Sequence, residues 1–218
     1  MSAAGRPSLS RAEISRTSGG MAPAPVLAFA GLALADWGAV AAQARRLEYV
    51  AKPGALAALV AWAVFDGGST WLVAALVLSL VGDVFLMLPG DRFVPGLAAF
   101  LLAHLAYVAA LPAPAGARFG WFVVALAVTA PLGLRILRAA EPDLRGAIAA
   151  YMAAIALMVA SAVASGIRIA ALGAILFLVS DTLIAWDRFV RPRAWSAVAI
   201  IVTYHLGQLG LVVGLLSR

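Results

Sequence analysis

Two acidic residues lie inside long apolar segments of the chain. Asp83 belongs to the run LSLVGDVFLML and Asp181 to the run AILFLVSDTLIAW. An ionisable side chain at the centre of a bilayer costs roughly 2.5–3.5 kcal/mol on insertion scales, so such residues commonly have a functional task. Two carboxyls that meet in a medium of low dielectric do not both ionise easily, which leaves a proton donor beside a proton acceptor. The pair indicates general acid–base chemistry, suited to hydrolysis of bonds that break by protonation followed by attack of water.

Four other polar side chains in apolar segments could assist the two carboxyls. His104 and Tyr107 share a helix face by their i, i+3 spacing, and Tyr204 and Gln208 share one by their i, i+4 spacing. The alternative is that each makes only an interhelical hydrogen bond, worth about 0.6 kcal/mol on average. Ser or Thr would serve that purpose, so this alternative explains the two aspartates less well than it explains the tyrosines and the glutamine.

The segments that carry these residues are long and apolar enough to cross a membrane. The chain is 64% hydrophobic and 12% charged, whereas soluble domains are roughly 45–50% apolar and 25% charged. A membrane-spanning helix needs about 20 apolar residues, and eight segments of near that length run over residues 24–42, 53–66, 70–89, 94–112, 119–138, 145–165, 169–186 and 195–216. We therefore predict an all-α, polytopic membrane bundle of about eight helices. Seven spans result if the short second segment is re-entrant.

The ends and the rare residue types narrow the possibilities further. Residues 1–20 are polar and are predicted to form a disordered tail, and residues 21–218 are predicted to form a single transmembrane domain. The alternative for the tail is that it lies upstream of a true start at Met21. The absence of cysteine excludes thiolate chemistry and disulfides, and two histidines are too few for a His-rich metal centre. We expect no metal and no cofactor.

The positive charge of the chain indicates membrane topology and not nucleic-acid binding. The formal net charge is +6, and the basic residues stand in short gaps between the apolar segments. Ten of them follow the first, third, fifth and seventh segments: Arg45, Arg46, Lys52, Arg92, Arg135, Arg138, Arg145, Arg188, Arg191 and Arg193. Cytoplasmic loops carry the excess of Lys and Arg, which predicts that these gaps face the cytoplasm and both termini face outward.

A short internal repeat relates the two aspartates. The sequence GDVFLMLPGDRF over residues 82–93 resembles SDTLIAWDRF over residues 180–189, and each places an aspartate before a loop with Asp-Arg-Phe. Four segments separate the copies, so both run in the same direction, as in a parallel four-plus-four duplication. Such a duplication would put Asp83 and Asp181 at similar depth, although chance similarity explains so short a match equally well.

Taken in order, these motifs resemble the YhhN family. The resemblance is carried by Lys52-Pro53, GDVFLML (82–88), FVPGLAAFLLAHLAY (93–107), GAILFLVSDTLIAWDRF (173–189) and Tyr204 with Gln208. It implies an eight-helix membrane protein that hydrolyses the vinyl ether of a lysophospholipid, the lysoplasmalogen, to a fatty aldehyde and a glycerophospho-alcohol. The catalytic residues that it implies are the two aspartates, and the implied substrate-binding positions are Lys52, His104, Tyr107, Ser180, Tyr204 and Gln208. Asp36 and His205 match no position of the family and are left out of the site.

Other functions of such a bundle leave different signatures. A proton-coupled transporter of lipids or small molecules would use the same buried aspartates, and its broken helices would recur in both halves. Pro131 interrupts the fifth segment without a counterpart in the first. An intramembrane aspartyl protease would resemble a Gly-x-Gly-Asp pattern, which is absent at Asp83. The Ala- and Arg-rich composition indicates a bacterial protein, and we expect it in the cytoplasmic membrane.

Overall fold

The computed structural model describes residues 23–218, which form eight long α-helices and one short 3-10 turn. The predicted tail over residues 1–20 lies outside the described residues. The helices are α2 (Pro23–Ala41), α3 (Arg45–Phe65), α4 (Thr70–Met87), α5 (Phe93–Ala110), α6 (Ala115–Ala139), α7 (Arg145–Ala164), α8 (Arg168–Phe189) and α9 (Ser196–Leu216), and the turn η1 is Pro142–Leu144. All eight are long and apolar enough to cross a membrane. The predicted all-α membrane bundle is therefore confirmed.

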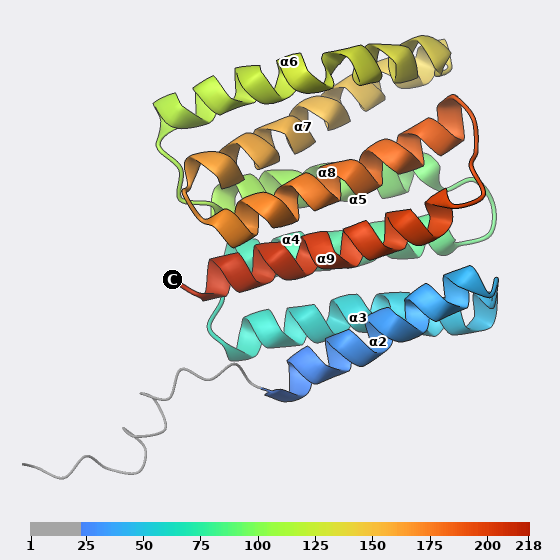
Figure 1. Cartoon of the computed structure of the whole chain (residues 1–218), viewed down its shortest axis with the longest axis vertical. Coiled ribbons are helices and arrows are strands. Elements are labelled where there is room, and N and C mark those ends of the chain that lie inside the picture. The colour runs from blue at the N-terminus through green and yellow to red at the C-terminus, as the bar shows by residue number, and fades with distance from the viewer. Residues whose placement is uncertain (1–22) are drawn as a thin grey trace, which may run out of the picture.

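The helices lie side by side as four antiparallel hairpins, α2–α3, α4–α5, α6–α7 and α8–α9 (Figure 1). The hairpin α2–α3 lies at one end of the molecule and α6–α7 at the other. Between them, α4–α5 and α8–α9 form the centre, where α7 packs on α5 and α8. The two predicted catalytic aspartates thus belong to α4 and α8, the first helices of the two central hairpins.

Helix α3 begins earlier than hydropathy predicts. The expected span started at Pro53, but the helix starts at Arg45 and carries Pro53 in its interior. The first two turns hold Arg45, Arg46 and Glu48, so an apolar window cannot detect them although they continue the helix beyond the bilayer core. Because of this extension, Lys52 lies inside the helix and not at its start.

Local sequence accounts for the connection between the first two hairpins and for the close packing within the last hairpin. Ser69 caps α4 by accepting a hydrogen bond from the backbone N–H of Leu72 at 3.2 Å, and the preceding turn uses Gly67 at φ +71°. In the α8–α9 hairpin, a Cβ added to Gly173 would lie 2.7 Å from the carbonyl oxygen of Gly207. Small residues at such crossings let helix backbones approach closely inside a membrane. The contact between Gly173 and Gly207 thus holds α9 close against α8.

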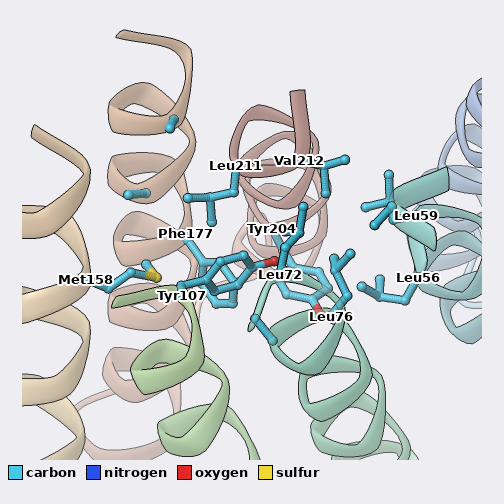
Figure 2. Close-up of a cluster of buried hydrophobic side chains, with 14 of the residues drawn as sticks. Leu56, Leu59, Leu72, Leu76, Tyr107, Met158, Phe177, Tyr204, Leu211 and Val212 are labelled. Atoms are coloured by element: carbon cyan, nitrogen blue, oxygen red, sulfur yellow. The ribbon is translucent and has the colours of Figure 1, made fainter. Parts of the chain in front are cut away.

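The interior of the bundle is apolar, and much of its outside is apolar as well. A central cluster joins all of the helices except α6, and Tyr107, Phe177 and Tyr204 lie among its aliphatic side chains (Figure 2). On the outer surface, Leu27 is 70% exposed and Val128 is 74% exposed. Side chains of this kind would be costly in water but are favourable against lipid acyl chains.

The two Asp-Arg-Phe copies of the predicted repeat meet in space, but the second copy lies in the last turn of α8 and not in a loop as expected. The Arg188 guanidinium donates a hydrogen bond to the Asp91 carboxylate at 2.6 Å, which joins the end of α8 to the loop before α5. The rings of Phe93 and Phe189 pack edge to face, with their centroids 5.6 Å apart. The phenylalanines of the two copies are thus neighbours, as a parallel duplication would place them. The duplication itself stays a prediction.

Candidate active site

Asp83 forms a buried ion pair with Lys52. The Lys52 Nζ lies 2.9 Å from the Asp83 Oδ1, and the side chains are only 15% and 2% exposed. The Tyr204 hydroxyl donates a hydrogen bond to the other carboxylate oxygen at 2.7 Å. Three helices, α3, α4 and α9, therefore converge on one carboxylate. Because α3 begins at Arg45, Lys52 lies within the helix and reaches the depth of Asp83.

Two further predicted residues extend this network. The Gln208 amide donates to the Tyr204 hydroxyl at 3.3 Å, and the Tyr107 hydroxyl donates to the Gln208 carbonyl oxygen. All three side chains are buried. The chain of hydrogen bonds directs the Tyr204 hydroxyl at Asp83, which explains why polar side chains are kept inside α5 and α9.

Asp181 has a different set of neighbours. The Tyr151 hydroxyl donates a hydrogen bond to the Asp181 Oδ2, and the His104 Nε2 lies 3.6 Å from the same oxygen. Neither His104 nitrogen has a hydrogen-bond partner among residues 23–218, and the ring is fully buried. Lys52 lies within 4.0 Å of Asp83, whereas no lysine or arginine of residues 23–218 lies that close to Asp181. Asp181 has a cationic neighbour only when His104 is protonated.

Sequence reasoning did not identify Tyr151. It lies two turns from the start of α7, and Asp181 lies two turns from the end of α8. Helices α7 and α8 are antiparallel neighbours, so the two residues have the same depth. The sequence signal that could have identified Tyr151 is its position in the neighbouring apolar segment at the same depth as Asp181.

An aromatic cluster separates the two carboxyl networks. The ring of Phe177 packs against His104 with centroids 4.9 Å apart and against Tyr204 with centroids 5.3 Å apart. Within residues 23–218, no hydrogen bond joins the Asp83 and Asp181 carboxyls directly. Each carboxyl has its own partners, and the space between them is bounded by aromatic rings.

The two carboxyls are associated with pockets of opposite character. The first pocket, named the apolar pocket here, encloses about 850 Å³ including its open mouth. Its lining is almost entirely aliphatic and aromatic, and Asp181 and Tyr151 provide its polar groups together with two threonines. The second, named the polar pocket, encloses about 470 Å³ and is lined by Arg45, Glu48, Tyr49, Lys52, Leu86 and Met87.

Leu86 is common to both pockets. It stands one helical turn after Asp83 on α4, and its side chain packs where α5 has Gly96. A Cβ added to Gly96 would lie 2.7 Å from the Leu86 Cδ2. The polar pocket, which Lys52 links to Asp83, and the apolar pocket, which Asp181 lines, therefore share the Leu86 side chain as part of their walls.

Several residues that the sequence analysis named make contacts other than with a substrate. The Ser180 hydroxyl donates to the Ile200 carbonyl oxygen at 3.0 Å and so links α8 to α9. Arg188 is paired with Asp91 at the end of the bundle, and Lys52 is paired with Asp83, so neither is a free cation. No group of three or more His, Cys, Asp or Glu residues that could hold a metal occurs in residues 23–218.

A second buried group involves the two residues that were left out of the site. Asp36 is fully buried, and neither of its carboxyl oxygens has a hydrogen-bond partner among the described residues. The His205 Nε2 lies 4.0 Å from its Oδ2, and the Trp37 indole donates to the His205 Nδ1 at 3.0 Å. The group joins α2 to α9, and none of its hydrogen bonds reaches Asp83 or Asp181.

The eight helices define a polytopic membrane protein, and its two carboxyl networks form a buried polar site between them. A model of the YhhN family matches residues 47–215. The chain therefore belongs to the YhhN family, and the match includes every residue of both carboxyl networks but excludes Asp36. No solved structure matches the chain significantly.

Several proteins of similar sequence are named lysoplasmalogenase. The human lysoplasmalogenase TMEM86B is 38% identical over 145 residues, which cover 66% of this chain and 63% of that protein. The rat lysoplasmalogenase TMEM86B is 36% identical over 163 residues, or 72% of this chain and 67% of that protein. A lysoplasmalogenase of Mycobacterium tuberculosis is 34% identical over 157 residues, or 66% of this chain and 59% of that protein. The matched region thus spans less than two thirds of the human and mycobacterial relatives.

Proposed function

We propose that the chain hydrolyses the vinyl ether bond of a lysoplasmalogen, releasing a fatty aldehyde and a glycerophospho-alcohol. The names of the relatives support this activity. We further propose that it acts in the cytoplasmic membrane of a bacterium, with the basic ends of the helices toward the cytoplasm.

The observation that carries the proposal is the meeting of the polar and apolar pockets at Leu86, beside the two carboxyls. In a lysoplasmalogen, the vinyl ether joins the polar glycerophosphate part to the hydrocarbon chain. A substrate with its polar part toward Lys52 and its chain in the apolar pocket would bring that bond between Asp83 and Asp181. In this proposed arrangement, the bond to be broken would lie at the boundary between the two pockets.

The surroundings of the carboxyls favour different roles for them. Asp83 is paired with a lysine at 2.9 Å and serves as the carboxylate. Asp181 faces the apolar pocket with Tyr151 and a buried histidine as its neighbours, and an uncompensated charge there would be costly. Asp181 is accordingly the group that carries the proton and acts as the general acid.

The reaction then follows from these roles. The Asp181 proton passes to the β-carbon of the vinyl ether, and an oxocarbenium ion forms at the carbon bonded to oxygen. The ionised Asp83 stabilises this cation, as paired carboxyls do in glycoside hydrolysis. Water adds to the cation and returns a proton to Asp181. The hemiacetal collapses with transfer of its hydroxyl proton to the glycerol oxygen, which gives aldehyde and alcohol.

The remaining residues of the site would orient the substrate. Tyr204, held by Gln208, fixes the Asp83 carboxylate. Arg45 lines the polar pocket without an acidic partner in residues 23–218, and a guanidinium is well suited to bind a phosphate. We therefore assign the headgroup phosphate to Arg45.

The test uses purified protein in detergent with three lysophospholipids that differ only in the bond at the first glycerol carbon. A vinyl ether, a saturated ether and an ester are supplied in turn, and free aldehyde is measured with a coupled aldehyde-reducing enzyme. We expect aldehyde from the vinyl ether alone. A folded protein that releases none would contradict the proposal, and vesicle flux of the intact lipid would then favour the transporter.

A further inference from the structure

We propose that the apolar pocket binds the hydrocarbon chain of the substrate, and that the contact between Gly133 and Met152 sets the length of chain it accepts. This inference rests on the proposed function, because it assigns the binding site for one part of the same lipid. It concerns two residues that take part in neither carboxyl network.

The apolar pocket has the lining that a hydrocarbon chain requires. Its walls come from Leu86 of α4, the first turns of α5, the second half of α6, the first half of α7 and the second half of α8. Along α8 it reaches from Leu178 to Phe189, which is roughly 16 Å at the rise of an α-helix. The reacting carboxyl therefore belongs to the wall of the same pocket that encloses the chain.

Helix α6 forms the least constrained wall. It packs on α7 and touches α8, and no extensive packing joins it to α5. Only Gly133 and Ile136 of this helix are buried, and both line the apolar pocket. A change at Gly133 therefore acts where α6 meets both α7 and the apolar pocket.

Gly133 and Met152 contact each other across the α6–α7 interface. A Cβ added to Gly133 would overlap the Met152 Cε, so the two cannot occupy their present positions together. The Met152 Cε is the free end of an unbranched, flexible side chain, which moves more readily than a helix backbone. Met152 also lines the pocket, so its displaced end would take up space that a chain occupies.

These contacts predict opposite effects for two substitutions. Gly133→Ala drives the Met152 side chain into the pocket and reduces the room for a long chain. Met152→Ala removes that side chain and enlarges the pocket. In the double variant the methyl group at position 133 has no Met152 to displace, so acceptance of long chains returns.

The experiment compares kcat/KM for lysoplasmalogens with a hexadecenyl and a decenyl chain. Gly133→Ala should lower the ratio of long-chain to short-chain activity by about tenfold or more, the effect of roughly one methylene of misfit in an apolar pocket. The double variant should restore the ratio to the wild-type value or above it. Gly120→Ala is the matched control, because that glycine lies in the same helix with no atom within 4 Å of an added Cβ.

A binding measurement separates this inference from the hydrolysis itself. Saturated-ether lysophospholipids with the same two chains are not cleaved, and the rise in melting temperature that each causes reports binding. Loss of the rise for the hexadecyl lipid in Gly133→Ala, with retention for the decyl lipid, supports the chain site even if no aldehyde is ever released. Unchanged discrimination in both assays by Gly133→Ala and by Met152→Ala would overturn it.

Discussion

Replacement of Lys52 by methionine tests the ion pair with Asp83 most sharply. Methionine keeps the length of the side chain and removes its charge, so a buried carboxylate loses the cation 2.9 Å from it. Removing one partner of a buried ion pair typically destabilises a protein by about 3–5 kcal/mol, because the other charge is left uncompensated in low dielectric. We expect a loss of that order in the free energy of unfolding.

Activity should fall together with stability, for a separate reason. Without the lysine, a charged Asp83 is no longer maintained beside the developing cation, and loss of such a preorganised electrostatic contact costs on the order of a hundredfold in kcat. The assays are unfolding by a denaturing detergent and release of aldehyde at a temperature where the variant is folded.

A double variant decides whether the pair or the individual residues matter. Lys52→Met combined with Asp83→Asn removes both charges, and replacing a whole buried pair by neutral groups is commonly tolerated. We expect the double variant to recover most of the lost stability while remaining inactive. A Lys52→Met protein as stable as the wild type, or strictly additive losses in the double variant, would refute the reasoning.

Three further perturbations follow from the same contacts. Tyr204→Phe removes one hydrogen bond to the ion-paired carboxylate and should lower kcat about tenfold, a change read directly from steady-state kinetics. Arg45→Met should raise KM for the lipid with little change in kcat, whereas Arg46→Met, one position along, should change neither value. The Arg188 guanidinium holds the pKa of the exposed Asp91 carboxyl below its usual value. The small stabilisation from this pair should be constant at neutral pH and disappear on acidification through the lowered pKa of Asp91, as seen by comparing the melting temperatures of Asp91→Asn and wild type across pH.

Composition and hydropathy are sufficient to predict most of this fold. The eight spans follow from apolar length alone, because the bilayer leaves the backbone few other options. The start of α3 could not be predicted in this way, since its first turns carry Arg45, Arg46 and Glu48. The position of Lys52 inside α3 depends on that extension, so its pairing with Asp83 could not be predicted from hydropathy.

The site was predictable in its residue types but not in its pairings. Asp83, Asp181, Tyr204 and Gln208 stand out because polar groups are costly inside apolar helices. The partner of each carboxyl depends on which faces of neighbouring helices meet, and α7 contacts α5, α6 and α8. The matched depth of Tyr151 made it a candidate partner of Asp181, but spacing along the chain could not show that its side chain faces α8.

The central claim is that Asp181 delivers the proton that breaks the vinyl ether. Its most direct test is the rate of aldehyde release by Asp181→Asn, with Asp143→Asn in the exposed turn η1 as the control for loss of a carboxylate. We predict a fall on the order of 10²–10⁴-fold, the usual contribution of a general acid, with an unchanged melting temperature and a fully active control. An Asp181→Asn protein that releases aldehyde at a rate close to that of the wild type would contradict the account.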